Sequence, residues 1–92
     1  MFLDAEILGF TAASLTTASF LPQAILTLKT RDTESLSLGM YSLFTTGVLC
    51  WLIYGLWIMD RAIIFANAIT FVLSAMILAF KLINTFKRLR KN

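Results

Sequence analysis

The chain lacks histidine and has one cysteine, Cys50, among its 92 residues. A single cysteine cannot form a disulfide within the chain, and without histidine a zinc cluster or a Cys–His catalytic pair is excluded. Cys50 lies in an apolar run, where a free cysteine behaves as a small hydrophobic side chain. We therefore expect no metal site and no cofactor.

Charge is also scarce, since 14% of the residues are charged whereas 59% are hydrophobic. A soluble domain of this size exposes a large share of its surface and could not hide so many apolar side chains. The composition therefore predicts one domain within a membrane. The sequence contains no phosphate-binding loop and no pair of acidic residues deep in an apolar run, so we do not expect an enzyme.

Three apolar runs cover residues 7–28, 40–59 and 62–83, and a basic tail covers residues 84–92. Each run has about 20 to 22 residues, or roughly 30–33 Å as a helix, which matches the hydrocarbon core of a bilayer. Backbone groups in lipid must be satisfied internally, so the runs predict an all-α membrane protein with three transmembrane helices in a single domain, 1–92. Lys81 is close enough to the end of the third run for its ammonium group to reach the interface.

The basic residues predict the orientation of these helices. With three spans, Arg61 alone lies on the side of the N-terminus, and the other seven lysines and arginines lie on the side of the C-terminus. The positive-inside rule then places the N-terminus outside and the C-terminus in the cytoplasm. We expect a multi-pass protein of the plasma membrane, which is the inner membrane in a bacterium. A basic tail next to a membrane exit usually sets topology or contacts anionic lipid, so we expect no nucleic-acid partner.

Polar groups within the runs indicate contacts beyond a simple bundle. Serine and threonine can bond to carbonyls of their own helix, but we do not expect this of the Gln23 and Asn67 amides. Each amide then needs a partner on another helix, in a cavity or on a ligand. A stripe of small residues in the third run permits close helix packing, either within the chain or between subunits: Ala62, Ala66, Thr70 and Ser74. A two-fold dimer would have six helices, enough to enclose a small cavity.

One face of the second run carries mostly bulky side chains at spacings of three and four residues: Met40, Phe44, Gly47, Trp51, Tyr54 and Ile58. Such a stripe is often lipid-facing or packed against another helix. Trp51, however, falls near the middle of the span, whereas tryptophan prefers the membrane interfaces. Gly47 leaves a gap between bulky neighbours. The pattern is therefore also consistent with a small-ligand pocket, in which Trp51 offers a flat face to a sugar ring and Asn67 offers hydrogen bonds to hydroxyls.

Several motifs together resemble the SemiSWEET bacterial sugar transporters of the PQ-loop group. The resemblance covers residues 7–83 and includes "SFLPQAILTLKTRDTESLSLGMYSLFTTGVLCWLIYG" and "FANAITFVLSAMIL". Its specific elements are the Pro22–Gln23 pair, "MYSLF", "WLIYG" and the "AN" that contains Asn67. The resemblance implies a parallel homodimer with one central path, and a substrate of the glucose or sucrose class flanked by Trp51 and Asn67.

The same resemblance implies a hinge at Pro22 and Gln23. Proline has no N–H to donate to the carbonyl of Ala18, and its ring clashes there, so a helix bends at a fixed place. In the predicted orientation this place lies in the cytoplasmic half of the span. A bend there would move the cytoplasmic end of the first helix.

Gates at both ends of the path are implied as well. The resemblance assigns Met40 and Phe44 to the cytoplasmic end, and Tyr54 and Asp60 to the outer gate. Family members often have an arginine at the position of Ile58, where it can pair with the aspartate. Arg61 is next to Asp60 and is a possible replacement.

The transport mode follows from the positions of the acidic residues, which lie at the ends of the runs or in loops: Asp4, Glu6, Asp32, Glu34 and Asp60. Proton-coupled carriers usually keep an ionisable group inside the membrane. We therefore predict uniport of a mono- or disaccharide by alternating access. The alternatives are a small membrane assembly subunit that does not transport, a PQ-loop carrier of another solute, and a passive channel.

Overall fold

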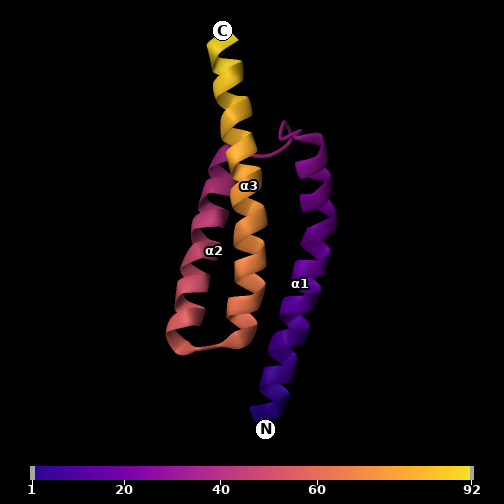
Figure 1. Ribbon diagram of the computed structural model, residues 1–92, viewed down its shortest axis with the longest axis vertical. Coiled ribbons are helices and arrows are strands. Elements are labelled where there is room, and N and C mark those ends of the chain that lie inside the picture. Colours follow the sequence, from indigo (N-terminus) through magenta and orange to yellow (C-terminus); the bar gives the residue numbers. More distant parts are fainter. Residues whose placement is uncertain (1, 92) are drawn as a thin grey trace.

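The computed structural model describes residues 2–91 as three helices (Figure 1). They are α1 (Phe2–Thr30), α2 (Leu38–Ile58) and α3 (Arg61–Lys91). The molecule is elongated, with extents of 59 × 25 × 15 Å. The predicted all-α, three-helix class is confirmed.

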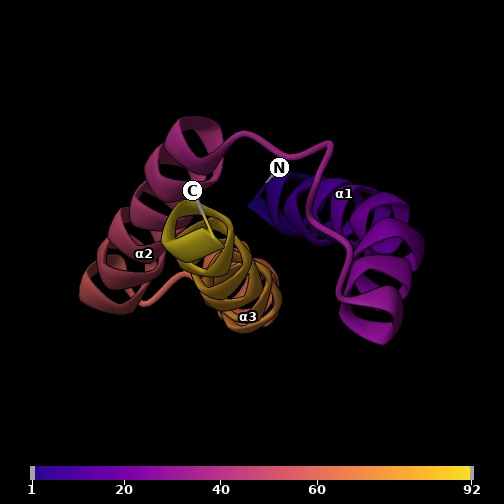
Figure 2. The same ribbon diagram turned by 90° about the horizontal axis from the view of Figure 1, so that it is seen from above.

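The helices are not arranged in the order of the sequence. Within residues 2–91, α3 packs against both α1 and α2, whose backbones are not in contact with each other. Figure 2 shows α1 and α2 on either side of α3. In Figure 1, α1 and α3 run in one direction and α2 runs in the other. The order across the bundle is therefore α1–α3–α2.

The small residues of α3 pack within the chain. Ala62 and Ser74 are buried, and a Cβ atom placed on Gly9 of α1 would lie 3.6 Å from the Cβ of Ala62. Small side chains thus bring α1 and α3 close together. Of the two interpretations of the stripe, packing within the chain accounts for these two positions.

The turn between α2 and α3 is short and closely fitted. Met59 has a left-handed backbone (φ 59°), and the N–H of Asp60 donates to the carbonyl of Gly55 at 2.9 Å, which ends α2. Asp60 then caps α3, since its Oδ1 accepts from the N–H of Ile63 at 3.1 Å. A Cβ atom on Gly55 would lie 2.7 Å from Cγ2 of Ile63. Glycine is therefore required where the two helices meet.

The third helix extends well beyond the apolar run. The sequence predicts a basic tail from residue 84, and in the structure residues 84–91 continue α3 as helix. This segment contains neither glycine nor proline, and its leucine, lysine and arginine residues favour helix. α1 likewise begins at Phe2 and ends at Thr30, beyond the predicted 7–28.

The protein buries few apolar side chains and exposes many. Its core is small and lies near the loop that joins α1 to α2, where Ala24, Tyr41 and Ile77 are buried together. By contrast, Trp57 is 85% exposed and Leu43 is 77% exposed. Exposing such an apolar surface to water is unfavourable, whereas lipid would solvate it.

Two helices of the described chain, α2 and α3, are long and apolar enough to cross a membrane. α1 has more hydroxyl side chains, and several of these donate to carbonyls one turn earlier in their own helix. Thr11 bonds to Ile7 at 2.8 Å and Thr16 to Ala12 at 3.0 Å. Such bonds satisfy a hydroxyl in an apolar environment, as the sequence predicts for serine and threonine.

Candidate functional site

Trp51 of α2 and Asn67 of α3 line the same groove, which has a volume of about 470 Å³. The groove is hollow because small residues of α1 and α3 form much of its wall: Gly9, Ala12, Ala13, Thr16, Ala62 and Ala66. Its volume falls within the ~300–1,000 Å³ typical of small-molecule sites. All three helices thus contribute to one concave surface.

The indole of Trp51 has one aromatic neighbour and remains largely accessible. The ring of Tyr54 meets it edge to face, with the centroids 5.7 Å apart, yet the Trp51 residue is 55% exposed. A second hollow of about 640 Å³ continues along α2 past Gly47, Cys50 and Trp51. A Cβ atom on Gly47 would meet no atom within 4 Å. Trp51 therefore offers a free aromatic face beside open space.

The amide of Asn67 is partly satisfied by its own helix. Its Nδ2 donates to the carbonyl of Ile63 at 2.9 Å, so the expectation that this amide cannot bond to its own helix is wrong. The i–4 carbonyl of a helix is within reach of an asparagine side chain in the rotamer that the structure has. A primary amide has two N–H groups and a carbonyl oxygen, so one N–H and the oxygen are available to a ligand.

Pro22 and Gln23 lie inside α1, which continues through them to Thr30 (Figure 1). Both side chains are exposed, and neither residue lines the groove of Trp51 and Asn67. The proline removes one backbone hydrogen bond from the interior of the helix. The Gln23 amide faces the surroundings of the chain and not its core.

At the loop end, Phe44 connects the two outer helices. Its ring centroid lies 6.2 Å from that of Phe20 in α1 and 5.9 Å from that of Tyr41 in α2. Met40, one turn before Phe44, is 52% exposed. The sequence does not single out Phe20, whose role depends on the α1–α3–α2 order. This aromatic contact lies two residues before Pro22.

At the opposite end, Arg61 does not pair with Asp60. Its Nη2 lies 3.7 Å from Oε1 of Glu6 in α1, and both side chains are solvent-accessible. Asp60 is instead engaged as the cap of α3, and it borders the hollow that Tyr54 and Ile58 also line. The sequence offers no clear signal for Glu6, which becomes a neighbour of Arg61 only through the packing of α1 on α3.

The loop between α1 and α2 is fixed to α3 by polar contacts, which we call the loop clasp (Thr33, Lys81 and Asn84). Lys81 does not reach the surface as expected: it is 7% exposed, and its Nζ donates to the carbonyl of Thr33 at 3.0 Å. Nδ2 of Asn84 lies 2.9 Å from both the carbonyl of Arg31 and the hydroxyl of Thr33. The clasp holds the end of α1 against α3.

Three packed helices with an apolar exterior, and with a groove lined by small, aromatic and amide residues, define a small helical membrane protein with an open, ligand-sized groove. Comparison with known proteins supports this class. Residues 5–60 match the family described as PQ loop repeat.

The chain is 45% identical over 80 residues to the sugar transporter SemiSWEET of Escherichia coli (strain UMEA 3162-1), covering 87% of this chain and 90% of that one. It is 44% identical over 77 residues to the protein of the same name from Bradyrhizobium diazoefficiens, covering 84% and 90%. A crystal structure of SemiSWEET in the inward-open conformation superposes with a TM-score of 0.86 at 43% identity, covering 91% of this chain and 98% of that one. The chain belongs to the SemiSWEET family of PQ-loop proteins.

Proposed function

We propose that the protein transports a mono- or disaccharide down its gradient across the membrane. The single observation that supports this best is the shared groove of Trp51 and Asn67. Three relatives of this chain are named sugar transporters. An indole, an amide and small apolar residues can bind a solute but offer no group for covalent chemistry, which is consistent with a carrier.

The chemistry of a sugar fits the two groups. One face of a pyranose presents C–H bonds, which pack on an aromatic ring such as the exposed indole of Trp51. Its edge presents hydroxyls, each of which both donates and accepts a hydrogen bond. The free N–H and oxygen of Asn67 supply both partners. An indole and an amide from each of two protomers would hold a sugar from two sides.

The working unit in this proposal is a parallel homodimer in the plasma membrane, with three spans per protomer. α1 serves as the third span, and several of its hydroxyls, such as those of Thr11 and Thr16, donate to carbonyls of their own helix. The N-terminus is outside and the C-terminus cytoplasmic, following the distribution of lysine and arginine. The groove is open along one side of the chain, and the Gln23 amide is exposed. A second protomer would close the groove and provide polar neighbours for Gln23.

Alternating access in this dimer would use Pro22–Gln23 as hinge, with Met40 and Phe44 narrowing the cytoplasmic end. The Phe20–Phe44 contact beside the proline supports this, because bending α1 there would separate the two rings. Tyr54 and Asp60 would form the outer gate. The acidic side chains of residues 5–91 lie in loops, at helix ends or in the first turns of α1. This arrangement favours uniport over proton coupling.

The test is uptake of labelled glucose and sucrose into proteoliposomes over a series of concentrations, with and without a proton gradient. The wild-type protein should show saturable uptake at the same rate with and without the proton gradient. Asn67→Ala removes one or two ligand hydrogen bonds of about 0.5–1.5 kcal/mol each, so transport efficiency should fall roughly tenfold. Trp51→Ala should have at least this effect.

Trp57→Ala is the matched control, because Trp57 is the more exposed tryptophan of the same helix and does not line the groove. It should transport like wild type. Equal background leakage of every sugar through wild type and variants would refute the proposal and favour an assembly subunit or a carrier of another solute. Flux that never saturates would instead indicate a channel.

A further inference from the structure

The last turns of α3 reach beyond the hydrocarbon core of a membrane. The helix has 31 residues, or about 46 Å, whereas the hydrocarbon core of a bilayer is about 30 Å thick. Figure 1 shows this end of α3 projecting past the loop that joins α1 to α2. Residues from Ile83 onward are therefore at the level of the lipid headgroups if the apolar part of α3 spans the core.

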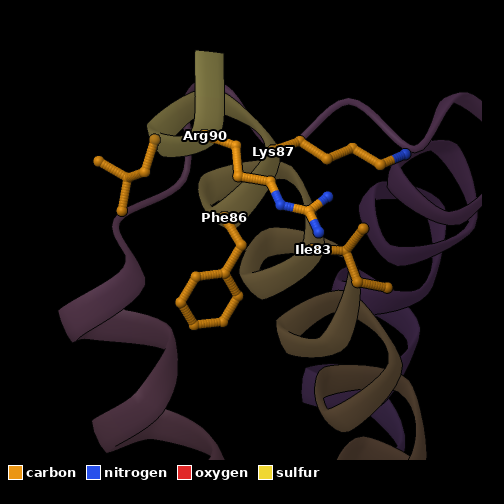
Figure 3. A pocket seen from close by; sticks show the side chains of 5 residues that line it. Ile83, Phe86, Lys87 and Arg90 are labelled. Carbon is orange, nitrogen blue, oxygen red and sulfur yellow. The ribbon is translucent and has the colours of Figure 1, made fainter. Parts of the chain in front are cut away.

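This end of α3 combines exposed apolar and basic side chains. Phe86 is 62% exposed and Leu89 is 61% exposed. Together with Ile83, Lys87 and Arg90 they line an open hollow of about 600 Å³. Figure 3 shows Ile83, Phe86, Lys87 and Arg90 projecting from successive turns of the helix. Ile83, Phe86 and Arg90 are three and four residues apart and share a face.

The basic groups of this hollow have no acidic partner within residues 5–91. The neighbouring loop has two acidic side chains. Glu34 pairs with Arg88, whose Nη1 is 3.4 Å from Oε1, and Oδ1 of Asp32 accepts from the N–H of Glu34 at 3.1 Å. No ion pair of the described chain involves Lys87 or Arg90. Two cations thus lie beside an exposed phenylalanine at the depth of the headgroups. The cations favour an anionic ligand, and the phenylalanine favours a ligand with an apolar part.

We propose that this hollow binds the headgroup of an anionic phospholipid. Arg90 can hold a phosphate with two parallel N–H donors, and Lys87 adds a second charge. Ile83 and Phe86 lie nearer to the hydrocarbon core than Lys87 and Arg90, and they contact the glycerol backbone and the first part of the acyl chain. The exposed apolar residues favour a lipid over a soluble phosphate, and the basic residues favour an anionic lipid over a zwitterionic one. The site depends on the insertion of α3 in a membrane and not on the transported solute.

The experiment counts bound phospholipid by native mass spectrometry of the full chain in detergent. Phosphatidylglycerol and phosphatidylcholine with the same acyl chains are added over a concentration series. We expect phosphatidylglycerol to bind more tightly. Arg90→Gln should weaken its binding about fivefold, the effect of one basic residue at an anionic surface. Phe86→Ala should weaken the binding of phosphatidylglycerol as well.

Lys29→Gln and Leu43→Ala are the matched controls. Lys29 is an exposed cation of α1 at the same end of the bundle, and Leu43 is an exposed apolar residue of α2. Neither should change the affinity. All four substitutions are at exposed positions, and circular dichroism checks that helix content is kept. Equal binding of the two lipids would overturn the proposal, because a site built on two cations must prefer the anionic lipid. Equal losses in Arg90→Gln and Lys29→Gln would overturn it as well, because they would leave only diffuse attraction of an anionic lipid to a basic protein.

Discussion

Single side chains of this protein often have a structural partner in addition to the role that the family pattern assigns to them. Asp60 is expected in the outer gate, and it also caps α3 through the N–H of Ile63. Asn67 is expected on the sugar, and its Nδ2 already donates to the carbonyl of Ile63. These local bonds fix the side-chain rotamers before a ligand arrives. A pre-oriented group loses less conformational entropy when it binds.

Lys81 gives a prediction at the same scale. Lys81→Met keeps the length and apolar stem of the side chain and removes only the donor to Thr33. Thr33 is 1% exposed, and its carbonyl also accepts from the N–H of Leu36 at 3.0 Å. The variant therefore loses one of two hydrogen bonds to this carbonyl, and the unfolding free energy should fall by about 0.5–1.5 kcal/mol. Denaturation in detergent, followed by circular dichroism, should show this loss. Lys87→Met changes an exposed lysine of the same helix and should show none. Equal stability of the two variants would contradict a structural role for the clasp.

At the scale of helices, the sequence predicts the features that depend on a local pattern of residues. The three helices follow from the length of the apolar runs, and the joint position of Trp51 and Asn67 follows from the family motifs. The partners of Lys81 and Arg61 do not follow. Thr33 is far from Lys81 in the chain, and Glu6 is far from Arg61. Such pairs exist only because α3 packs between α1 and α2, and this order is not encoded in any one segment.

Pro22 gives the prediction for a helix. Pro22→Ala restores an N–H that can donate to the carbonyl of Ala18, and the exposed position of Pro22 means that no core packing is lost. A helix without the break bends less easily, so we expect slower sugar uptake with an unchanged or raised melting temperature. Stopped-flow measurement of initial uptake rates in proteoliposomes tests this. Ile25→Ala alters an exposed residue of the same helix and leaves the backbone bonds intact. If Pro22→Ala transports at the wild-type rate, the hinge is elsewhere.

For the whole molecule, Cys50 reports on the proposed dimer without any engineered label. It is the one cysteine of the chain, it is exposed, and it lines the hollow next to Trp51. In a parallel dimer whose grooves face each other across a two-fold axis, the two Cys50 thiols lie on opposite sides of the same path. A short bis-maleimide should therefore link wild-type chains into dimers in membranes, and Cys50→Ser should abolish the linked band. As a control for random collision, Trp57→Cys in the Cys50→Ser background places an exposed thiol on α2 outside this hollow, and it should give much less product. Efficient labelling of Cys50 by a single maleimide without any linked dimer would show that the grooves do not face each other, and the sugar path would then need another arrangement of protomers.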